Sequence, residues 1–179
     1  MQCRKCGGFT LLEVLAAMFV LAVGALGAAG SQAVSARLRQ QAALESEAVA
    51  LAASLAARMR VNTAQTALSD AANPYLELDY DAAGGAPSAP PVHCFGAACD
   101  SAQLARFDLH EVEQAVHDAF PGGRILLCRD AAVTSGALDW TCSGASSAPL
   151  VVKIGWRRPA AAGLAPSVPT PVVAMVVSG

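Results

Sequence analysis

Close to its N-terminus the chain carries a long apolar stretch that holds a single ionisable side chain. From residue 9 to residue 36 only Glu13 is charged, and no Lys or Arg follows until Arg37. About 20 apolar residues are enough for a helix to cross the hydrocarbon core of a membrane. Arg4 and Lys5 precede the stretch, so the positive-inside rule places the N-terminus in the cytoplasm. The sequence of 179 residues therefore predicts one anchoring helix followed by one modest domain.

Glu13 is an unusual residue for such a helix. A carboxylate inside an apolar membrane helix costs a few kcal/mol, and residues of this kind are usually functional and paired. Glu13 lies near the cytoplasmic end of the stretch, where its side chain can reach the interface. A partner forms if the chain is cut after Gly8, because the cut creates an α-amino group on Phe9, four residues before Glu13. We expect Glu13 to pair with such an ammonium once helices pack together.

Residues 7–14 read GGFTLLEV and closely resemble the class III signal of type IV pilins and type II secretion pseudopilins. The resemblance implies that prepilin peptidase cuts between Gly8 and Phe9 and that Phe9 becomes the N-methylated first residue. It also implies that Glu13 supports methylation and sets the register of each subunit against its neighbour's N-terminus. Two other interpretations are an ordinary secretory signal, cut near residues 28–30, and a plain transmembrane anchor.

The helical pattern continues beyond the apolar stretch, and no proline occurs before Pro74. We expect a cytoplasmic leader over residues 1–8, which is cleaved, and a membrane or filament-core half of the helix over residues 9–30. An amphipathic half over residues 31–62 then packs on a periplasmic globular domain of residues 63–179. A coiled-coil dimer is the alternative for the second half, although alanine fills many seam positions. Apolar residues recur in that half at helical spacing, at Leu38, Ala42, Ala48, Val49, Ala52, Leu55, Ala56 and Met59.

The C-terminal part of the chain alternates between periodic segments and breakers. Residues 71–91 are rich in Pro and Gly and predict a loop. Asp100 or Ser101 is expected to cap a helix that runs to Ala119. Short strands are predicted at residues 124–129, 138–142, 150–156 and 172–177. The predicted class is α+β, with a long N-terminal helix packed against a small antiparallel β-sheet, which is the pilin fold.

Four cysteines lie in this domain, behind a membrane segment, where disulfides are expected. Four cysteines allow three connectivities. We favour Cys94–Cys99, which closes a tight loop before the helix, and Cys128–Cys142, which would tie two neighbouring strands. Zinc bound at His93 and Cys94 is the weaker alternative. Cys3 and Cys6 have metal-like spacing but lie in the leader, where chance spacing is the simpler explanation.

The sequence gives no indication of enzymatic chemistry, a metal or a cofactor. His110 and His117 lie on one predicted helix without a catalytic context, and the pair Asp79 and Asp81 has too few further oxygen ligands for calcium. The net charge is −2 and no basic block occurs, so nucleic acid is not an expected partner.

The resemblance narrows further along the chain. Residues 57–62 read ARMRVN and resemble the ADRMRAN stretch of the PilV family of minor pilins, the type IV pilus modification proteins. Ala57 stands where Asp is usual, and Val61 replaces Ala. Residues 99–109, 120–123 and 152–156 follow the order of that family.

This resemblance implies a minor pilin that primes type IV pilus assembly and sits in the pilus tip complex. Its expected partners are other minor pilins, the major pilin, the prepilin peptidase and N-methyltransferase, the inner membrane and a tip adhesin. The expected location is the inner membrane and then the pilus tip at the cell surface. A minor pseudopilin of a type II secretion system and an anchored periplasmic protein that never assembles are the alternatives.

Overall fold

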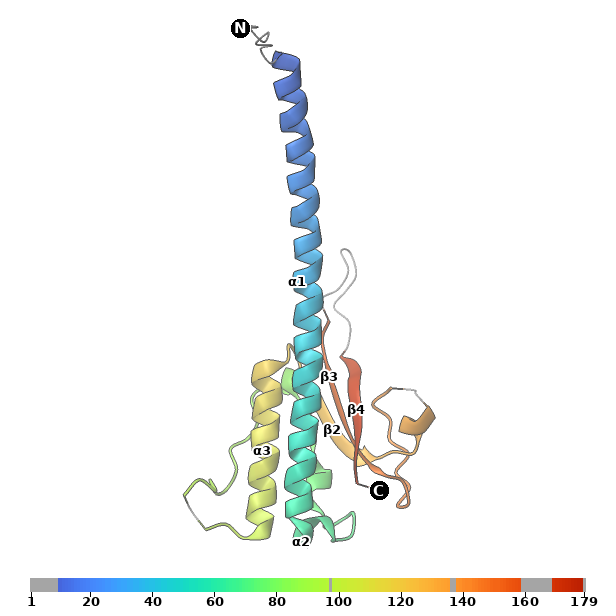
Figure 1. Ribbon diagram of the computed structural model, residues 1–179. Coiled ribbons are helices and arrows are strands. Elements are labelled where there is room, and N and C mark those ends of the chain that lie inside the picture. Colours follow the sequence, from blue (N-terminus) through green and yellow to red (C-terminus); the bar gives the residue numbers. More distant parts are fainter. Residues whose placement is uncertain (1–9, 97, 136–137, 159–168, 179) are drawn as a thin grey trace, which may run out of the picture. The chain divides into compact units, whose positions relative to one another are not determined.

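The computed structural model describes residues 10–96, 98–135, 138–158 and 169–178. The chain divides into two compact units, Met1–Ala43 and Leu44–Gly179. Helix α1, Leu11–Val61, begins in the first unit and ends in the second (Figure 1). Its end agrees to within one residue with the predicted end at Asn62. The helix continues through Gly24, Gly27 and Gly30.

The second unit is built on a four-stranded antiparallel sheet with the strand order β1-β2-β3-β4. The strands are β1, Asp79–Asp81; β2, Arg124–Arg129; β3, Leu150–Trp156; and β4, Thr170–Ser178. The predicted bounds of β2 and β3 are correct, and β4 is longer than predicted. The α+β class, with a long N-terminal helix and a small antiparallel sheet, is confirmed.

One strand prediction and one loop prediction are wrong. Residues 138–142 form no strand and run as an irregular segment. Residues 71–91 are not all loop, because they contain β1 and the short 3-10 helices η1, Pro74–Glu77, and η2, Ala82–Gly84. In β1 Asp79 and Asp81 pair with Leu126 and Arg124 at the sheet edge. The physical reason for the second error is that β1 is very short and lies between Pro and Gly residues, which hide a strand signal.

Helix α3, Ser101–Ala119, has the predicted bounds and the predicted cap. The Asp100 carboxylate accepts the N–H of Gln103, and the Gln103 side chain accepts the N–H of Asp100 in return. This capping box satisfies two donors that a helix N-terminus otherwise leaves unpaired. Short helical turns α2, Thr63–Thr66, and η3, Ala132–Ser135, complete the unit.

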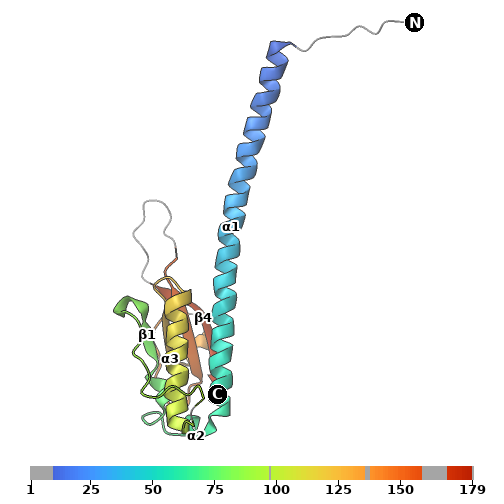
Figure 2. The same cartoon turned by 90° about the vertical axis from the view of Figure 1, so that its left-hand side faces the viewer.

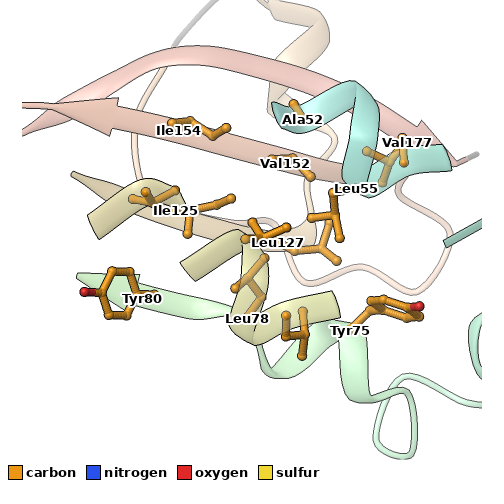
Figure 3. Packing of buried hydrophobic residues seen from close by; sticks show 14 of the residues in the cluster. Ala52, Leu55, Tyr75, Leu78, Tyr80, Ile125, Leu127, Val152, Ile154 and Val177 are labelled. Carbon is orange, nitrogen blue, oxygen red and sulfur yellow. The ribbon is translucent and has the colours of Figure 1, made fainter. Parts of the chain in front are cut away.

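One face of the sheet carries the hydrophobic core. Residues 44–61 of α1 and helix α3 run antiparallel to each other and pack on this face (Figures 1 and 2). The small side chains of Ala48, Ala52 and Ala56 in α1 are almost fully buried in this core. Figure 3 shows Leu55 and Ala52 of α1 against the strands. The sheet contributes Ile125, Leu127, Leu150, Val152, Ile154, Trp156 and Val177.

A partly buried polar network joins the end of α1 to α3. The Arg58 guanidinium contacts the carboxylates of Asp108, at 2.9 Å, and Glu111. The Asn62 side-chain amide donates to the Ser101 carbonyl at 2.8 Å and to the Tyr75 hydroxyl at 3.2 Å. Tyr75 donates in turn to Asp108 at 3.0 Å. Arg58 and Asn62 are four residues apart, so they share a face of α1 and hold α3 at two levels.

The second face of the sheet is also covered, and for this reason every residue of β3 is buried. The described residues of the segment between β2 and β3, 130–135 and 138–149, lie over it. The Lys153 ammonium is fully buried there and contacts the Asp130 carboxylate at 2.6 Å and the carbonyls of Asp139 and Thr141 at 2.9 and 2.6 Å. Three acceptors satisfy the three N–H donors of an ammonium. Lys153 is thus the buried centre that holds the cover on the sheet.

Trp140 also attaches the cover to the sheet. Its indole N–H donates to the Pro169 carbonyl at 2.8 Å, and the Arg124 guanidinium lies 4.7 Å from its ring centroid. Gly155 of β3 lies beneath, and a Cβ there would collide with the backbone of Thr170 and the Trp140 ring. Residues 138–142, which the sequence predicts as a strand, are therefore part of the cover over β3. They form no strand because Lys153 binds the backbone carbonyls of Asp139 and Thr141, which a neighbouring strand would otherwise pair.

We expect Lys153→Met to destabilise the domain by about 3–5 kcal/mol, because it leaves the Asp130 carboxylate buried without its cation. Urea unfolding of the mature chain in detergent, followed by tryptophan fluorescence, measures this. The matched variant Lys153→Met/Asp130→Asn removes both charges and should recover part of the loss. Equal losses in the two variants would contradict the charge argument.

The same pair gives the stability a dependence on pH. Burial alone would raise the pKa of Asp130, yet Lys153 and backbone N–H donors hold that pKa below its usual value. Arg129 likewise lowers the pKa of Asp70. A depressed carboxyl pKa contributes stability above the unfolded value of about 4, which is lost as the pH falls through the folded pKa.

We therefore expect the urea concentration at the unfolding midpoint to decrease when the pH is lowered below about 4. The decrease should be smaller in the Lys153→Met/Asp130→Asn variant. Glu113 acts in the opposite direction, since burial raises its pKa and its protonation favours the folded state as the pH falls towards its unfolded value. Measurements in Glu113→Gln remove that contribution. A midpoint that is constant from pH 6 to pH 3 in the Glu113→Gln background would contradict the prediction.

Candidate functional site

The first turn of α1 contains the one described residue of the predicted processing site. The Thr10 hydroxyl accepts the N–H of Glu13 at 3.3 Å, so Thr10 occupies a capping position ahead of the helix. Glu13 lies in the first turn, where the partial positive charge of the helix N-terminus favours a carboxylate. Gly8 and Phe9 lie outside the described residues, as do Cys3 and Cys6. The cut and the N-methylation therefore stay predictions.

Glu13 has no cation near it in the described part of the chain, and its side chain is exposed. The residues around it are apolar and equally exposed: Leu11, Leu12 and Phe19 expose 70–80% of their surface. All residues from Thr10 to Ala43 are exposed. Helix α1 is long and apolar enough to cross a membrane, with a mean hydropathy of 2.3 over its most apolar 18 residues. Such a surface needs lipid or other apolar helices to cover it, and Glu13 needs a cation within that cover.

The cysteines of the second unit lie in two pairs at disulfide distance. The Cα atoms are 5.7 Å apart for Cys94 and Cys99 and 6.2 Å apart for Cys128 and Cys142. These are the two pairs that the sequence favours. The reason given for the second pair is wrong, however, because Cys142 lies in the irregular cover and Cys128 in β2. The second pair therefore ties the cover to the sheet rather than strand to strand.

Most of the other candidate ligands are engaged in the fold, whereas the buried Nδ1 of His110 has no hydrogen-bond partner in the described part of the chain. His117 exchanges a hydrogen bond with the Tyr80 hydroxyl at 2.8 Å, and Asp79 pairs with Arg124 at 3.1 Å. Asp81 accepts the N–H of Ala83 at 2.8 Å. His93 packs edge-on against Phe107. The described residues contain no group of three or more His, Cys, Asp or Glu side chains that could hold a metal ion.

The N-terminal geometry agrees with a comparison against protein families. Residues 3–29 match the family described as the prokaryotic N-terminal methylation motif. The chain carries this motif. It indicates a type IV pilin-like or pseudopilin protein, and such a motif implies processing by prepilin peptidase and assembly with other pilins. No curated protein and no solved structure matches the chain.

The methylation motif accounts for the unpaired Glu13 and for the exposed apolar surface of α1, but not for the domain. Sequence reasoning missed the structural role of Lys153, although a signal for it exists. Lys153 is the only lysine outside the leader and stands in the middle of an otherwise apolar strand. A lone charge in a strand buried on both faces predicts a buried partner.

We expect both cysteine pairs to be disulfides in the mature protein. Alkylation without reduction, followed by proteolysis and mass spectrometry, should yield Cys94 linked to Cys99 and Cys128 linked to Cys142. Chemical reduction should loosen the cover and lower the melting temperature, and Cys128→Ser/Cys142→Ser should reproduce most of that loss. A peptide that links Cys94 to Cys128 would overturn the assignment.

Proposed function

We propose that this chain is a minor pilin of the PilV family that primes type IV pilus assembly and sits in the pilus tip complex. In this proposal residues 1–8 are the leader, residues 9–30 the membrane or filament-core segment, residues 31–62 the amphipathic half of the helix and residues 63–179 the periplasmic domain. The precursor is a single-pass inner-membrane protein with its N-terminus in the cytoplasm. The mature protein moves to the pilus tip at the cell surface.

The observation that carries the proposal is Glu13, an unpaired carboxylate in the first turn of an apolar, exposed helix within the methylation motif. Prepilin peptidase would cut between Gly8 and Phe9 and leave an ammonium on Phe9. Glu13 of one subunit would then meet the Phe9 ammonium of a neighbour. Opposite charges attract strongly where helices exclude water, so this pair would set the register between subunits.

The driving force for assembly would be burial of apolar surface. Leu11, Leu15, Phe19 and Leu26 are all exposed, and their burial against a neighbouring helix contributes about 25 cal/mol per Å² when the surface leaves water. For a subunit that leaves the bilayer the gain comes instead from close packing and from the charge pair, since lipid is as apolar as leucine. The mechanism is non-catalytic and requires no cofactor and no metal.

The PilV assignment is supported by the role of the residues that carry the resemblance. Arg58 and Asn62 of the ARMRVN stretch make the polar network that joins α1 to α3. Because this stretch makes the contact between α1 and α3, proteins that share it are expected to share the same domain architecture. In the proposed tip complex the domain would contact other minor pilins, the major pilin and a tip adhesin.

The runner-up function is a minor pseudopilin of a type II secretion system, since the methylation motif occurs in both classes of precursor. Deletion of the gene distinguishes them. Loss of surface pili with normal protein secretion favours the minor pilin, and the opposite result favours the pseudopilin.

The test of the assembly mechanism is Glu13→Val. We expect this variant to be cleaved normally, because Gly8 is intact, but to lack full N-methylation and to restore few or no pili to a deletion strain. Mass spectrometry of the N-terminal peptide and pilus counts by electron microscopy provide the two measurements. The matched control is Glu47→Val, which removes an exposed carboxylate later in the same helix and should leave both readouts unchanged.

A mature N-terminus at Met1 would contradict the cut after Gly8. Wild-type pilus numbers in Glu13→Val would remove the pairing role of Glu13 while leaving the processing site intact.

A further inference from the structure

A small aromatic pocket lies beside α3, on the surface of the second unit. It is formed by the stripe Phe107, His110, Glu111 and Gln114 of α3 and by His93 and Phe95 from the segment that precedes the helix. Residues at this spacing share one face of a helix. The pocket volume is about 250 Å³. Pockets for drug-sized ligands measure about 300–1,000 Å³, so this one fits a single side chain better than a free metabolite.

The aromatic walls of the pocket stand nearly at right angles. The Phe95 ring meets the Phe107 ring at 88°, with centroids 5.0 Å apart, and the His93 ring meets it at 78°. Phe107 is buried, whereas Phe95 exposes 77% of its surface. The fold thus holds a large apolar ring in water, where it loses the free energy of burial until a partner covers it.

Phe95 lies between a paired cysteine and a glycine. It follows Cys94, which lies at disulfide distance from Cys99, and Gly96 follows it with φ at 73°, in the left-handed region that favours glycine. The backbone therefore turns directly after Phe95, whose ring packs edge-on against Phe107.

Two polar side chains of the pocket, Glu111 and Gln114, offer unpaired acceptors, and the buried Nδ1 of His110 has no hydrogen-bond partner among the described residues. Glu111 uses one carboxylate oxygen for Arg58, and no hydrogen bond from the described part of the chain reaches its other oxygen, Oε1. Gln114 spends its amide N–H groups on Asp118, so its carbonyl oxygen also faces no donor among the described residues. Arg58 carries one positive charge against the two carboxylates of Asp108 and Glu111, which leaves one negative charge here.

We propose that this pocket, which we call the aromatic pocket, binds an arginine side chain of a protein partner. Aromatic faces attract cations, and the flat guanidinium stacks on rings while its N–H fork reaches carboxylate and amide oxygens. Rings, unpaired acceptors and a net negative charge occur together at this site. A neutral apolar side chain would fill the volume but leave the acceptors without donors. The proposal adds a binding surface on the domain and does not depend on the assembly role of Glu13.

The test uses the mature full-length chain in detergent micelles with ¹³C-labelled Phe and His. The probe is the peptide acetyl-Gly-Arg-Gly-amide, and the matched control replaces Arg by citrulline, which has nearly the same shape and no charge. We expect saturable shifts of the Phe95, Phe107 and His93 ring signals with the arginine peptide. The citrulline peptide should bind at least ten-fold more weakly.

Variants then locate the site. Phe95→Ala should weaken binding of the arginine peptide at least five-fold without changing the melting temperature, because this ring is exposed. Phe95→Trp keeps a ring and should bind as tightly as the wild type or more tightly. Val61→Ala removes an apolar side chain that is exposed elsewhere in the unit and should bind as the wild type does.

Equal affinity for the arginine and citrulline peptides would overturn the proposal, as would wild-type affinity in Phe95→Ala. Methyl glucoside serves as a further probe. Saturable shifts of the same rings by this neutral sugar, with none by the arginine peptide, would assign the pocket to carbohydrate and reject the cation.

Discussion

The burial of one stripe of α1 in the core that it shares with α3 and the strands is the contact on which the second unit depends. The stripe combines the small side chains of Ala48, Ala52 and Ala56 with the larger Leu55 and Met59. A domain of this size needs such a shared core in order to bury enough apolar surface. The polar network at Arg58 and Asn62 then fixes the end of the same stripe, so packing and hydrogen bonding specify one arrangement.

The same helix illustrates two kinds of apolar surface. In residues 44–61 one stripe of apolar side chains is buried by the domain, while Val49 and Val61 stay exposed. In residues 11–36 they surround the helix and stay exposed in the single chain. A stripe is completed within a subunit, whereas an all-round apolar helix requires lipid or neighbouring subunits. The sequence states this division plainly, through the sudden appearance of Arg37 and the charges after it.

Sequence patterns predicted the parts of the fold that rest on local chemistry. The long helix, the Asp100 cap and the strand at residues 150–156 follow from periodicity and capping. The strand β1 and the cover that residues 130–135 and 138–149 form over β3 do not, because they depend on contacts between distant residues. Residues 138–142 alternate like a strand, yet Lys153 takes the carbonyls of Asp139 and Thr141. At the candidate site Glu13 was evident from its charge alone, whereas the aromatic pocket needs the packing of residues 93–95 beside α3.

The cover over β3 is attached at separate points: through Cys142, through the carbonyls that Lys153 holds, and through Trp140 against Gly155. Residues 145–147, which lie along the chain between Cys142 and β3, are exposed and do not belong to the hydrophobic core. The residues that maintain the fold are therefore distinct from these surface residues. Substitutions in this short stretch can give related subunits different outer surfaces while every strand keeps its register.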